Sequence, residues 1–385
     1  MRGRTLDMPS PSRSLDDVET PAAVVDLDRM ERNLARAADY AAQHGLALRP
    51  HVKTHKSPLV GARQLALGAH GLTCATPHEA EVMATVCDDL LVAYPPVGAL
   101  RAKRLAALPE RVRLTVALDS EESVAEIARA ADETGRRVFV YVELDLGMHR
   151  VGVPVVEKAA VLAKSISRHR SLEFSGVAFY PGHVREPVQD QNAKLDALRD
   201  ALRDALGRLA EAGVAARVVS GGSTPTLWRT HEIPEITEFR PGTYVYNDRT
   251  TAELGACATD DCALTVLATV VSTAVPGQAV IDAGGKALGR EPVRGVDGEG
   301  FGQLLEHPEV LVSRMSEEHG MLDLSRSSWR PVVGERVRVV PNHVCIVVHL
   351  NDVIFGVRAE RVEAAWPVAA RGRGERVEMT DIRSH

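Results

Sequence analysis

Apolar and polar positions follow a repeating pattern along the first 220 residues of the chain. Short apolar runs, such as residues 22–26, are each followed by a longer segment in which apolar residues recur every three or four positions. Met30, Leu34, Ala37 and Ala41 show this spacing in the first long segment. The short runs predict β-strands, and the long segments predict amphipathic α-helices.

The alternation predicts an α/β fold. Strands that alternate with helices form a parallel sheet, and eight such units close a barrel in about 250 residues. A doubly wound sheet is the alternative, but it usually begins with a glycine-rich dinucleotide loop, whereas Asp26-Leu27-Asp28 follows the first strand here. We therefore favour a (β/α)8 TIM-like barrel. Its strands are expected at residues 22–26, 46–48, 71–75, 90–93, 112–118, 138–143, 174–180 and 218–220, with helices at 28–44, 58–67, 77–85, 99–108, 120–134, 155–167 and 189–212.

The pattern changes after about Asp248. Shorter strands are expected at residues 263–274, 278–282, 337–340, 345–350 and 353–357, and they are separated by turn sequences such as Pro276-Gly277 and Asn351-Asp352. This pattern is typical of an all-β domain. We predict a partly disordered lead-in at residues 1–19, a barrel domain at 20–250 and a C-terminal β domain at 251–385.

Composition narrows the class of protein. The 385 residues are 45% apolar and 25% charged, as in ordinary globular domains, and the net charge of -6 gives no reason to expect a nucleic-acid or acidic-membrane partner. The sequence contains no apolar run of the roughly 20 residues that cross a bilayer, and its N-terminus lacks an apolar signal core. Five cysteines, an odd number, predict free thiols in a reducing cytoplasm.

Lys53 is the first candidate for chemistry. It lies in the segment Arg49-Pro50-His51-Val52-Lys53-Thr54-His55-Lys56, directly after a predicted strand, where ligand sites of α/β proteins gather. A partly desolvated lysine near other cationic groups loses basicity and can form a Schiff base with an aldehyde cofactor. A basic, solvated loop is the alternative.

Two glycine-containing segments are candidates for an anion site. Ser220-Gly221-Gly222-Ser223-Thr224-Pro225-Thr226 follows a predicted strand, and its N–H and hydroxyl groups suit a phosphate. Arg240-Pro241-Gly242-Thr243 lies about 20 residues later at the next strand end and would add N–H donors. A tight turn and a surface arginine are the alternatives.

His343 and Cys345 are candidate metal ligands. On the predicted strand, residues two apart face the same way, and imidazole with thiolate suits zinc. Two ligands are fewer than zinc needs, so coincidence remains an alternative. His349 lies on the same predicted face but ~13 Å further along the strand.

Five segments together resemble the D-threonine aldolase and D-serine dehydratase family. Enzymes of this family have the alanine racemase-like fold (fold type III), in which an N-terminal barrel holds pyridoxal 5'-phosphate (PLP) and a β domain follows. The resemblance runs from about Thr20 to Arg371. The five segments are 49–56, 220–226, 240–242, 316–320 (Ser-Glu-Glu-His-Gly) and 341–345 (Pro-Asn-His-Val-Cys).

The resemblance implies a role for individual residues. Lys53 would form the Schiff base, with His51 near the cofactor and Lys56 as an exposed neighbour. Arg150 would lie near the cofactor's phenolic oxygen, and Arg240 against its pyridine nitrogen. The phosphate would be held by Gly222, Ser223, Thr224, Gly242 and Thr243; Tyr180 and His183 would line the catalytic site; His343 and Cys345 would bind the metal.

The metal pair helps to choose the reaction. In this family the dehydratases tend to carry His-x-Cys with zinc, and the aldolases His-x-Asp with manganese or magnesium, which agrees with ligand softness. Cys345 therefore indicates elimination of water from a small β-hydroxy D-amino acid, giving a 2-oxo acid and ammonia. Zn²⁺ is the expected metal, with Mn²⁺ or Mg²⁺ as further options. Retro-aldol cleavage to glycine and an aldehyde is the alternative reaction.

Two other classes of protein remain as alternatives. An amino-acid racemase on this fold would need a second base, for which His319 is the candidate. A non-catalytic PLP carrier would normally be a single barrel, so the predicted β domain opposes it. Because the metal pair and Lys53 lie in different predicted domains, and by analogy with the fold, we expect a homodimer in which the β domain of one chain covers the barrel of the other.

Overall fold

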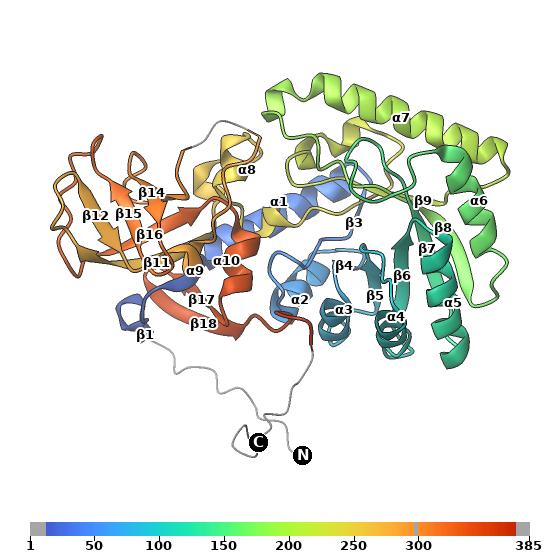
Figure 1. The fold of residues 1–385 in the computed structure, drawn as a ribbon, viewed down its shortest axis with the longest axis horizontal. Helices are drawn as coiled ribbons and strands as arrows, with labels where there is room; N and C mark the ends of the chain where they lie inside the picture. Colours follow the sequence, from blue (N-terminus) through green and yellow to red (C-terminus); the bar gives the residue numbers. More distant parts are fainter. Residues whose placement is uncertain (1–12, 296–298, 375–385) are drawn as a thin grey trace, which may run out of the picture.

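The computed structural model describes residues 13–295 and 299–374. Two parts lie side by side (Figure 1): an α/β barrel, and a β domain that contains the C-terminal strands together with the first strands of the chain. Within the described ranges, no helix is both long and apolar enough to cross a membrane.

The barrel confirms the expected fold class. In the part of the chain that the structure describes, eight parallel strands are ordered β3-β10-β9-β8-β7-β6-β5-β4. The circle closes between β3 and β4, where His51 bridges Thr73 and the His70 N–H donates to Leu48 O at 2.8 Å. The strands are β3 (Ala47–Leu48), β4 (Leu72–Cys74), β5 (Asp89–Val92), β6 (Arg113–Leu118), β7 (Val138–Glu143), β8 (Leu172–Ala178), β9 (Val218–Gly221) and β10 (Glu238–Phe239).

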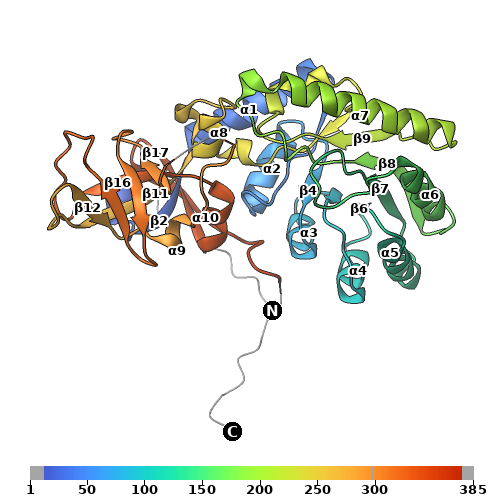
Figure 2. The same cartoon turned by 45° about the horizontal axis from the view of Figure 1, so that its top comes forward.

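Helices surround the strands (Figure 2). Local sequence sets several of their ends: Pro58 and Pro77 occupy the first turns of two helices, and the Ser120 side chain accepts a hydrogen bond from the Ser123 N–H at the start of a third. The helices are α1 (Leu27–Gln43), α2 (Pro58–Ala66), α3 (Pro77–Met83), α4 (Ala99–Ala106), α5 (Glu121–Thr134), α6 (Val156–Ile166), α7 (Asn192–Glu211), α8 (Arg249–Glu253), α9 (Gly285–Leu288) and α10 (Val344–Leu350).

The β domain takes its first strands from the N-terminus. Among the described residues, its sheet has ten strands, and β2 (Ala22–Asp26) pairs with β11 and β17 in it. The first strand of the alternating pattern is therefore not part of the barrel, which starts at β3. The other strands of this sheet are β1 (Arg13–Ser14), β11 (Leu264–Ser272), β12 (Gln278–Ile281), β13 (Gly302–Leu304), β14 (Leu311–Met315), β15 (Gly320–Asp323), β16 (Arg336–Pro341), β17 (Val353–Arg358) and β18 (Arg361–Pro367).

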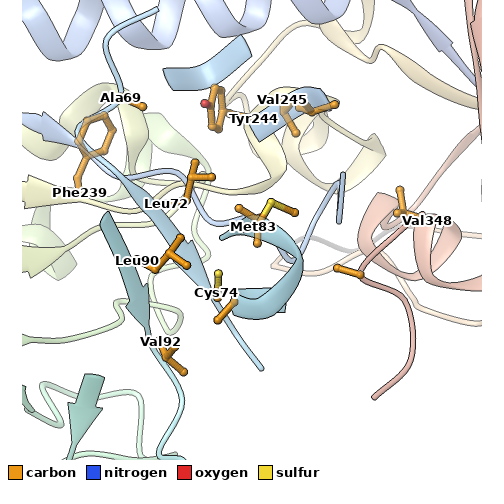
Figure 3. Packing of buried hydrophobic residues seen from close by; sticks show 14 of the residues in the cluster. Ala69, Leu72, Cys74, Met83, Leu90, Val92, Phe239, Tyr244, Val245 and Val348 are labelled. Atoms are coloured by element: carbon orange, nitrogen blue, oxygen red, sulfur yellow. The ribbon is translucent and has the colours of Figure 1, made fainter. Parts of the chain in front are cut away.

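One hydrophobic core joins the two parts. Leu72 and Leu90 from barrel strands, Met83 from α3 and Val348 from α10 belong to the same buried cluster. Figure 3 shows these side chains together with Phe239 and Tyr244, with α10 at one side of the view. Packing of this kind fixes how α10 faces the barrel, and α10 carries one of the expected metal ligands.

Residues 344–350 form a helix, so the strand expected at 345–350 is wrong. The segment is rich in β-branched residues, which favour strands, but Val344, Val347 and Val348 are buried at helical spacing. The Asp248 carboxylate accepts a hydrogen bond from the Val344 N–H at 3.2 Å, at the first turn of the helix. Tertiary packing and this contact from a distant residue outweigh the local preference.

A buried ion-pair network fills part of the barrel interior. The guanidinium of Arg49 bonds Glu238 at 2.6 Å and Asp89 at 2.7 Å, and its side chain is 1% exposed. The Ser220 hydroxyl donates to the second oxygen of Glu238 at 2.6 Å. The network links the strand before Lys53 to the strand before Arg240.

We expect Arg49→Met to lower the free energy of unfolding by about 3–5 kcal/mol, because it leaves the Glu238 carboxylate buried without its positive partner. Urea denaturation followed by circular dichroism measures the change. Arg208→Met, which removes a guanidinium that is 50% exposed, should leave the urea midpoint nearly unchanged. Equal effects of the two substitutions would contradict the role given to the network.

Candidate active site between the barrel and the β domain

Lys53 lies at the carboxyl edge of the barrel, in the loop after β3. Its side chain is half-buried, and its Nζ lies 5.6 Å from the centre of the Tyr180 ring. Lys56 is different: it is buried and paired with Glu79, which is fully buried. The expectation that Lys56 is an exposed neighbour is wrong, because Glu79 on α3 draws its side chain into the protein. Lys53 is the lysine of this segment that faces the site.

Positive charge gathers around Lys53. Burial, and then the charges of Lys53 and Arg240, hold the pKa of His51 well below its usual range, so its ring is neutral. The guanidinium carbon of Arg150 lies 4.9 Å from the centre of the Tyr180 ring. Lys53 Nζ approaches the same ring. Such a group of cations suits an anionic ligand.

Arg240 is 7% exposed. Its Nη2 donates to Phe179 O at 2.7 Å and to Ser220 O at 3.3 Å, which fixes the guanidinium against two neighbouring strands. Its Nε is buried and has no hydrogen-bond partner among the described residues. One carboxylate oxygen of Glu143, at the end of β7, is likewise buried and has no hydrogen-bond partner among the described residues. Burial raises the pKa of Glu143, and the charges of Arg240 and Arg150 oppose that rise.

The two glycine-containing loops come together beside this group. Gly222 has a φ of 93°, which glycine adopts without strain. A Cβ on Gly242 would lie 2.9 Å from Thr54 Oγ1, so glycine lets this loop approach the Lys53 segment. Ser223 and Thr243 both line a cavity at the boundary between the barrel and the β domain. Thr224 does not line that cavity; its hydroxyl accepts a hydrogen bond from the Tyr244 N–H at 3.3 Å and ties the two loops together.

His343 and Cys345 reach the barrel of their own chain. Cys345 Sγ lies 3.3 Å from Thr54 Oγ1, one residue from Lys53, and the charges of His343 and Cys345 act on each other. His343 Nδ1 lies 3.1 Å from the Asp248 carboxylate, which fixes the ring and leaves Nε2 as the nitrogen able to bind a metal. The two side chains meet as expected, but as the first residues of a helix rather than on one strand face.

The electrostatics of this pair favour the thiolate. Burial raises the pKa of Cys345, but the His343 charge, the hydrogen bond from His343 and the Lys53 charge lower it to about 7. Burial lowers the pKa of His343, and the neighbouring Cys345 and Asp248 raise it to about 11. These shifts describe an imidazolium–thiolate pair. The ionised thiol is the form that binds a metal, and His343 Nε2 would give up its proton when the metal binds.

A cavity of about 90 Å³ at the boundary between the two parts is lined by some of these residues, although Lys53, Arg240 and Cys345 are not among them. Tyr180, Ser223 and Thr243 come from the barrel, and Asp248 and His343 directly precede α8 and α10. Figure 2 shows α10 between the β domain and the barrel helices, next to this boundary. The cavity is also lined by Gly182, Val184, Arg185, Pro225, Thr250, Thr251, Leu254 and Arg294.

Three histidines considered from the sequence lie outside this cavity. The His183 ring packs beside Gly147, and its Nδ1 has no partner in the described part of the protein; it does not line the cavity. His319 is exposed at the turn between β14 and β15, so it is not placed as a second base beside Lys53 in this chain. His349 is exposed on α10, where the charge of Lys56 acts on it, so it does not join the metal pair.

The sequence did not reveal several residues of the site. Asp248 could have been noticed as a helix cap, since Asp248 and Thr251 form a capping box, but its contact with His343 spans 95 positions. Tertiary structure also brings Glu79 to Lys56. It places Arg185 and Arg294 at the cavity in the same way.

Comparison with known proteins identifies the chain. Residues 25–250 match the family "Alanine racemase, N-terminal domain", and residues 263–357 match a "serine dehydratase domain". The chain is 32% identical to the 3-hydroxy-D-aspartate aldolase of Paracoccus denitrificans (strain Pd 1222), over 96% of each chain. It is 35% identical to the D-threo-3-hydroxyaspartate dehydratase of Delftia sp. (strain HT23), over 85% of this chain and 91% of the relative.

Solved structures agree with this result. The D-threonine aldolase of Filomicrobium marinum superposes with a TM-score of 0.85 at 33% identity, covering 94% of this chain and 99% of that chain. A cysteine-to-alanine variant of D-threo-3-hydroxyaspartate dehydratase, in the metal-free form, gives a TM-score of 0.83 at 32% identity, covering 92% and 98%.

The fold and the residues around Lys53 define a PLP-dependent enzyme of the alanine racemase-like class. Within this class, the chain belongs to the D-threonine aldolase and D-serine dehydratase family of lyases that act on β-hydroxy D-amino acids. The expected family is confirmed.

The residues present fit a PLP molecule and a metal ion. No described residue accepts a hydrogen bond from the N–H of Thr243, which lines the cavity, and the buried Arg240 Nε also lacks a partner. Such donors suit the anionic and acceptor groups of the cofactor. Within the described ranges no third His, Cys, Asp or Glu joins His343 and Cys345, so a bound metal would keep positions open, as catalytic metals do.

Proposed function

We propose that this protein is a PLP- and zinc-dependent lyase that removes water from a β-hydroxy D-amino acid and releases a 2-oxo acid and ammonia. One observation carries the proposal: the thiol of Cys345 lies 3.3 Å from the hydroxyl of Thr54, so a metal-binding pair stands beside Lys53 within one chain.

The barrel residues would hold the cofactor. Lys53 Nζ would bind its aldehyde carbon, and Ser223 and Thr243 would bind its phosphate from the two glycine-containing loops. Gly222, Thr224 and Gly242 would shape these loops, and Arg150 would lie near the phenolic oxygen. When bound, PLP spreads the negative charge left on the substrate's α-carbon.

Arg240 would face the pyridine nitrogen. A guanidinium does not give up its proton, so it would keep that nitrogen unprotonated. Its two bonds to backbone carbonyls hold it in place. Tyr180 would keep Lys53 and Arg150 in position, since both cations lie against its ring.

Lys53 would also move the proton. Its Nζ, once released by the substrate amine, would take the proton from the α-carbon as a general base. Zinc held by His343 and Cys345 supplies Lewis-acid chemistry toward the β-oxygen when bound.

Dehydration is favoured over retro-aldol cleavage by the chemistry of the metal pair. Cys345 ionises with a pKa of about 7, and thiolate selects zinc, whereas carboxylate suits manganese or magnesium. Retro-aldol cleavage remains the second candidate, because relatives at 30% to 32% identity are aldolases. Incubation with D-serine tests the choice: pyruvate and ammonia support dehydration, and glycine with formaldehyde supports cleavage.

A homodimer remains a proposal by analogy with the fold. His343 and Cys345 reach Lys53 within their own chain, so the dimer is not needed to join the two groups. Light scattering at assay concentration tests it, and a fully active monomer would contradict it.

We expect Asp248→Asn to weaken metal binding about 10–100-fold, because Asp248 fixes the His343 ring through Nδ1 and makes it a better ligand. Asparagine keeps the acceptor that caps α8 but replaces the oxygen that accepts from the Val344 N–H, so urea denaturation should accompany the measurement. Competition against a chromophoric chelator measures the affinity. Asp282→Asn, at a part-buried carboxylate that bonds Thr20 and Thr269, is the control and should leave the affinity unchanged.

A further inference from the structure

Two arginines line the cavity beside the metal pair. Arg185 follows the Tyr180 loop of the barrel, and Arg294 lies in the segment between β12 and β13 of the β domain. Their backbones meet: a Cβ on Gly295 would lie 2.1 Å from Arg185 O, so the position next to Arg294 has no room for a side chain. Glycine there lets both arginines reach one cavity from opposite sides of the domain boundary.

The charges of these arginines are only partly balanced. Arg185 Nε donates to Gly182 O at 2.7 Å, which fixes the base of the guanidinium, and no carboxylate in the described part of the chain forms an ion pair with it. Arg294 is paired with Glu291, three residues away on its own segment. Asp248, the acidic residue that lines the cavity, is already bonded to His343 and to two backbone N–H groups.

A cavity with this surplus of guanidinium suits a second anionic group on the ligand. Arginine binds carboxylate in a planar, two-bond geometry. The substituent on the β-carbon distinguishes the substrates of this class: it is hydrogen in D-serine, methyl in D-threonine and carboxylate in 3-hydroxyaspartate. Only the last would pair with the two arginines.

We propose that Arg185 and Arg294 form a subsite for a carboxylate on the β-carbon, and that the preferred substrate is a four-carbon β-hydroxy D-amino dicarboxylate. This inference rests on the proposed function. In the reaction, the α-proton and the β-hydroxyl leave as water. Hydrolysis of the resulting imine then consumes one water, so the net products are a 2-oxo dicarboxylate and ammonia.

The test compares D-threo-3-hydroxyaspartate with D-serine on the metal-loaded holoenzyme. The wild-type enzyme should favour the dicarboxylate by at least about tenfold in kcat/KM. Arg185→Gln and Arg294→Gln should each lower kcat/KM for the dicarboxylate by about 10–100-fold and change it less than about twofold for D-serine. Arg290→Gln is the matched control, since that guanidinium lies four residues from Arg294 and does not line the cavity.

Binding provides a second readout that does not depend on turnover. D-aspartate and D-alanine lack the β-hydroxyl, so their binding can be followed by the absorbance of the bound cofactor. D-aspartate should bind more tightly than D-alanine in the wild-type enzyme, and the two Arg→Gln variants should remove the difference.

The outcomes separate the possible sources of the anion. An equal loss for D-serine and the dicarboxylate would mean that the arginines bind the α-carboxylate, and weaker retention of PLP would mean that they bind the cofactor phosphate. Either result overturns the subsite, as does a wild-type preference for D-serine or D-threonine. If no β-hydroxy D-amino acid is turned over at all, the proposed function itself fails.

Discussion

Lys53→Ala is expected to lower kcat by at least about 10³-fold, because the variant loses both the amine that binds the cofactor and the base that takes the α-proton. The absorbance band of the lysine-bound cofactor should disappear as well. The structure gives the reason for choosing this lysine: its Nζ faces the Tyr180 ring at the cavity, whereas the neighbouring Lys56 is paired with Glu79.

Lys56→Ala is the control for this experiment. It should keep the absorbance of the lysine-bound cofactor but lower the free energy of unfolding by about 3–5 kcal/mol, because the fully buried Glu79 carboxylate loses its positive partner. Absorbance spectra and urea denaturation of both variants give the answer. The assignment is wrong if Lys56→Ala removes the band and Lys53→Ala keeps it.

Loss of the metal should also lower the rate of turnover strongly. Chelation, or Cys345→Ala, is expected to lower turnover of D-serine by at least about 10²-fold, because the β-hydroxyl is a poor leaving group without a Lewis acid. Cofactor absorbance should persist in both cases, since Lys53 is on the barrel. Exchange of the α-proton with solvent deuterium should also persist, because Lys53 and the cofactor are sufficient for that step.

Two further variants refine the metal prediction. Cys345→Asp should weaken zinc and shift preference toward manganese, with more retro-aldol cleavage relative to dehydration. Cys87→Ser is the thiol control: Cys87 donates to Asp89 O at the other end of the barrel, and serine can make the same bond. Full turnover by Cys345→Ala, or an equal loss in Cys87→Ser, would contradict the role of the metal pair.

Much of the barrel could be predicted because its signals are local. Apolar periodicity gave the strands and helices from β3 to β9 within a few residues, and motif order indicated the family. The strand at residues 22–26 was also correct as a strand, but its neighbours β11 and β17 come more than 200 residues later. No local pattern states which sheet a strand joins.

The errors in the site have the same origin. Residues 344–350 look like a strand because local preference favours it, and they fold as a helix because three valines pack against the barrel and Asp248 holds the first turn. Lys56 looks exposed in a basic segment, and Glu79 buries it. The metal pair was proposed from the softness of thiolate and imidazole together with the resemblance to the family. Its position beside Lys53 in the same chain required the packing of α10.

The most direct test of the proposed lyase is product analysis beside metal analysis. Purified holoenzyme would be incubated with D-serine and with D-threo-3-hydroxyaspartate, before and after chelation, while bound zinc is quantified by elemental analysis. We expect a 2-oxo acid and ammonia in equal amounts, about one zinc per active chain, and loss of turnover that zinc restores. Glycine with an aldehyde as the main products, or full turnover without metal, would contradict it.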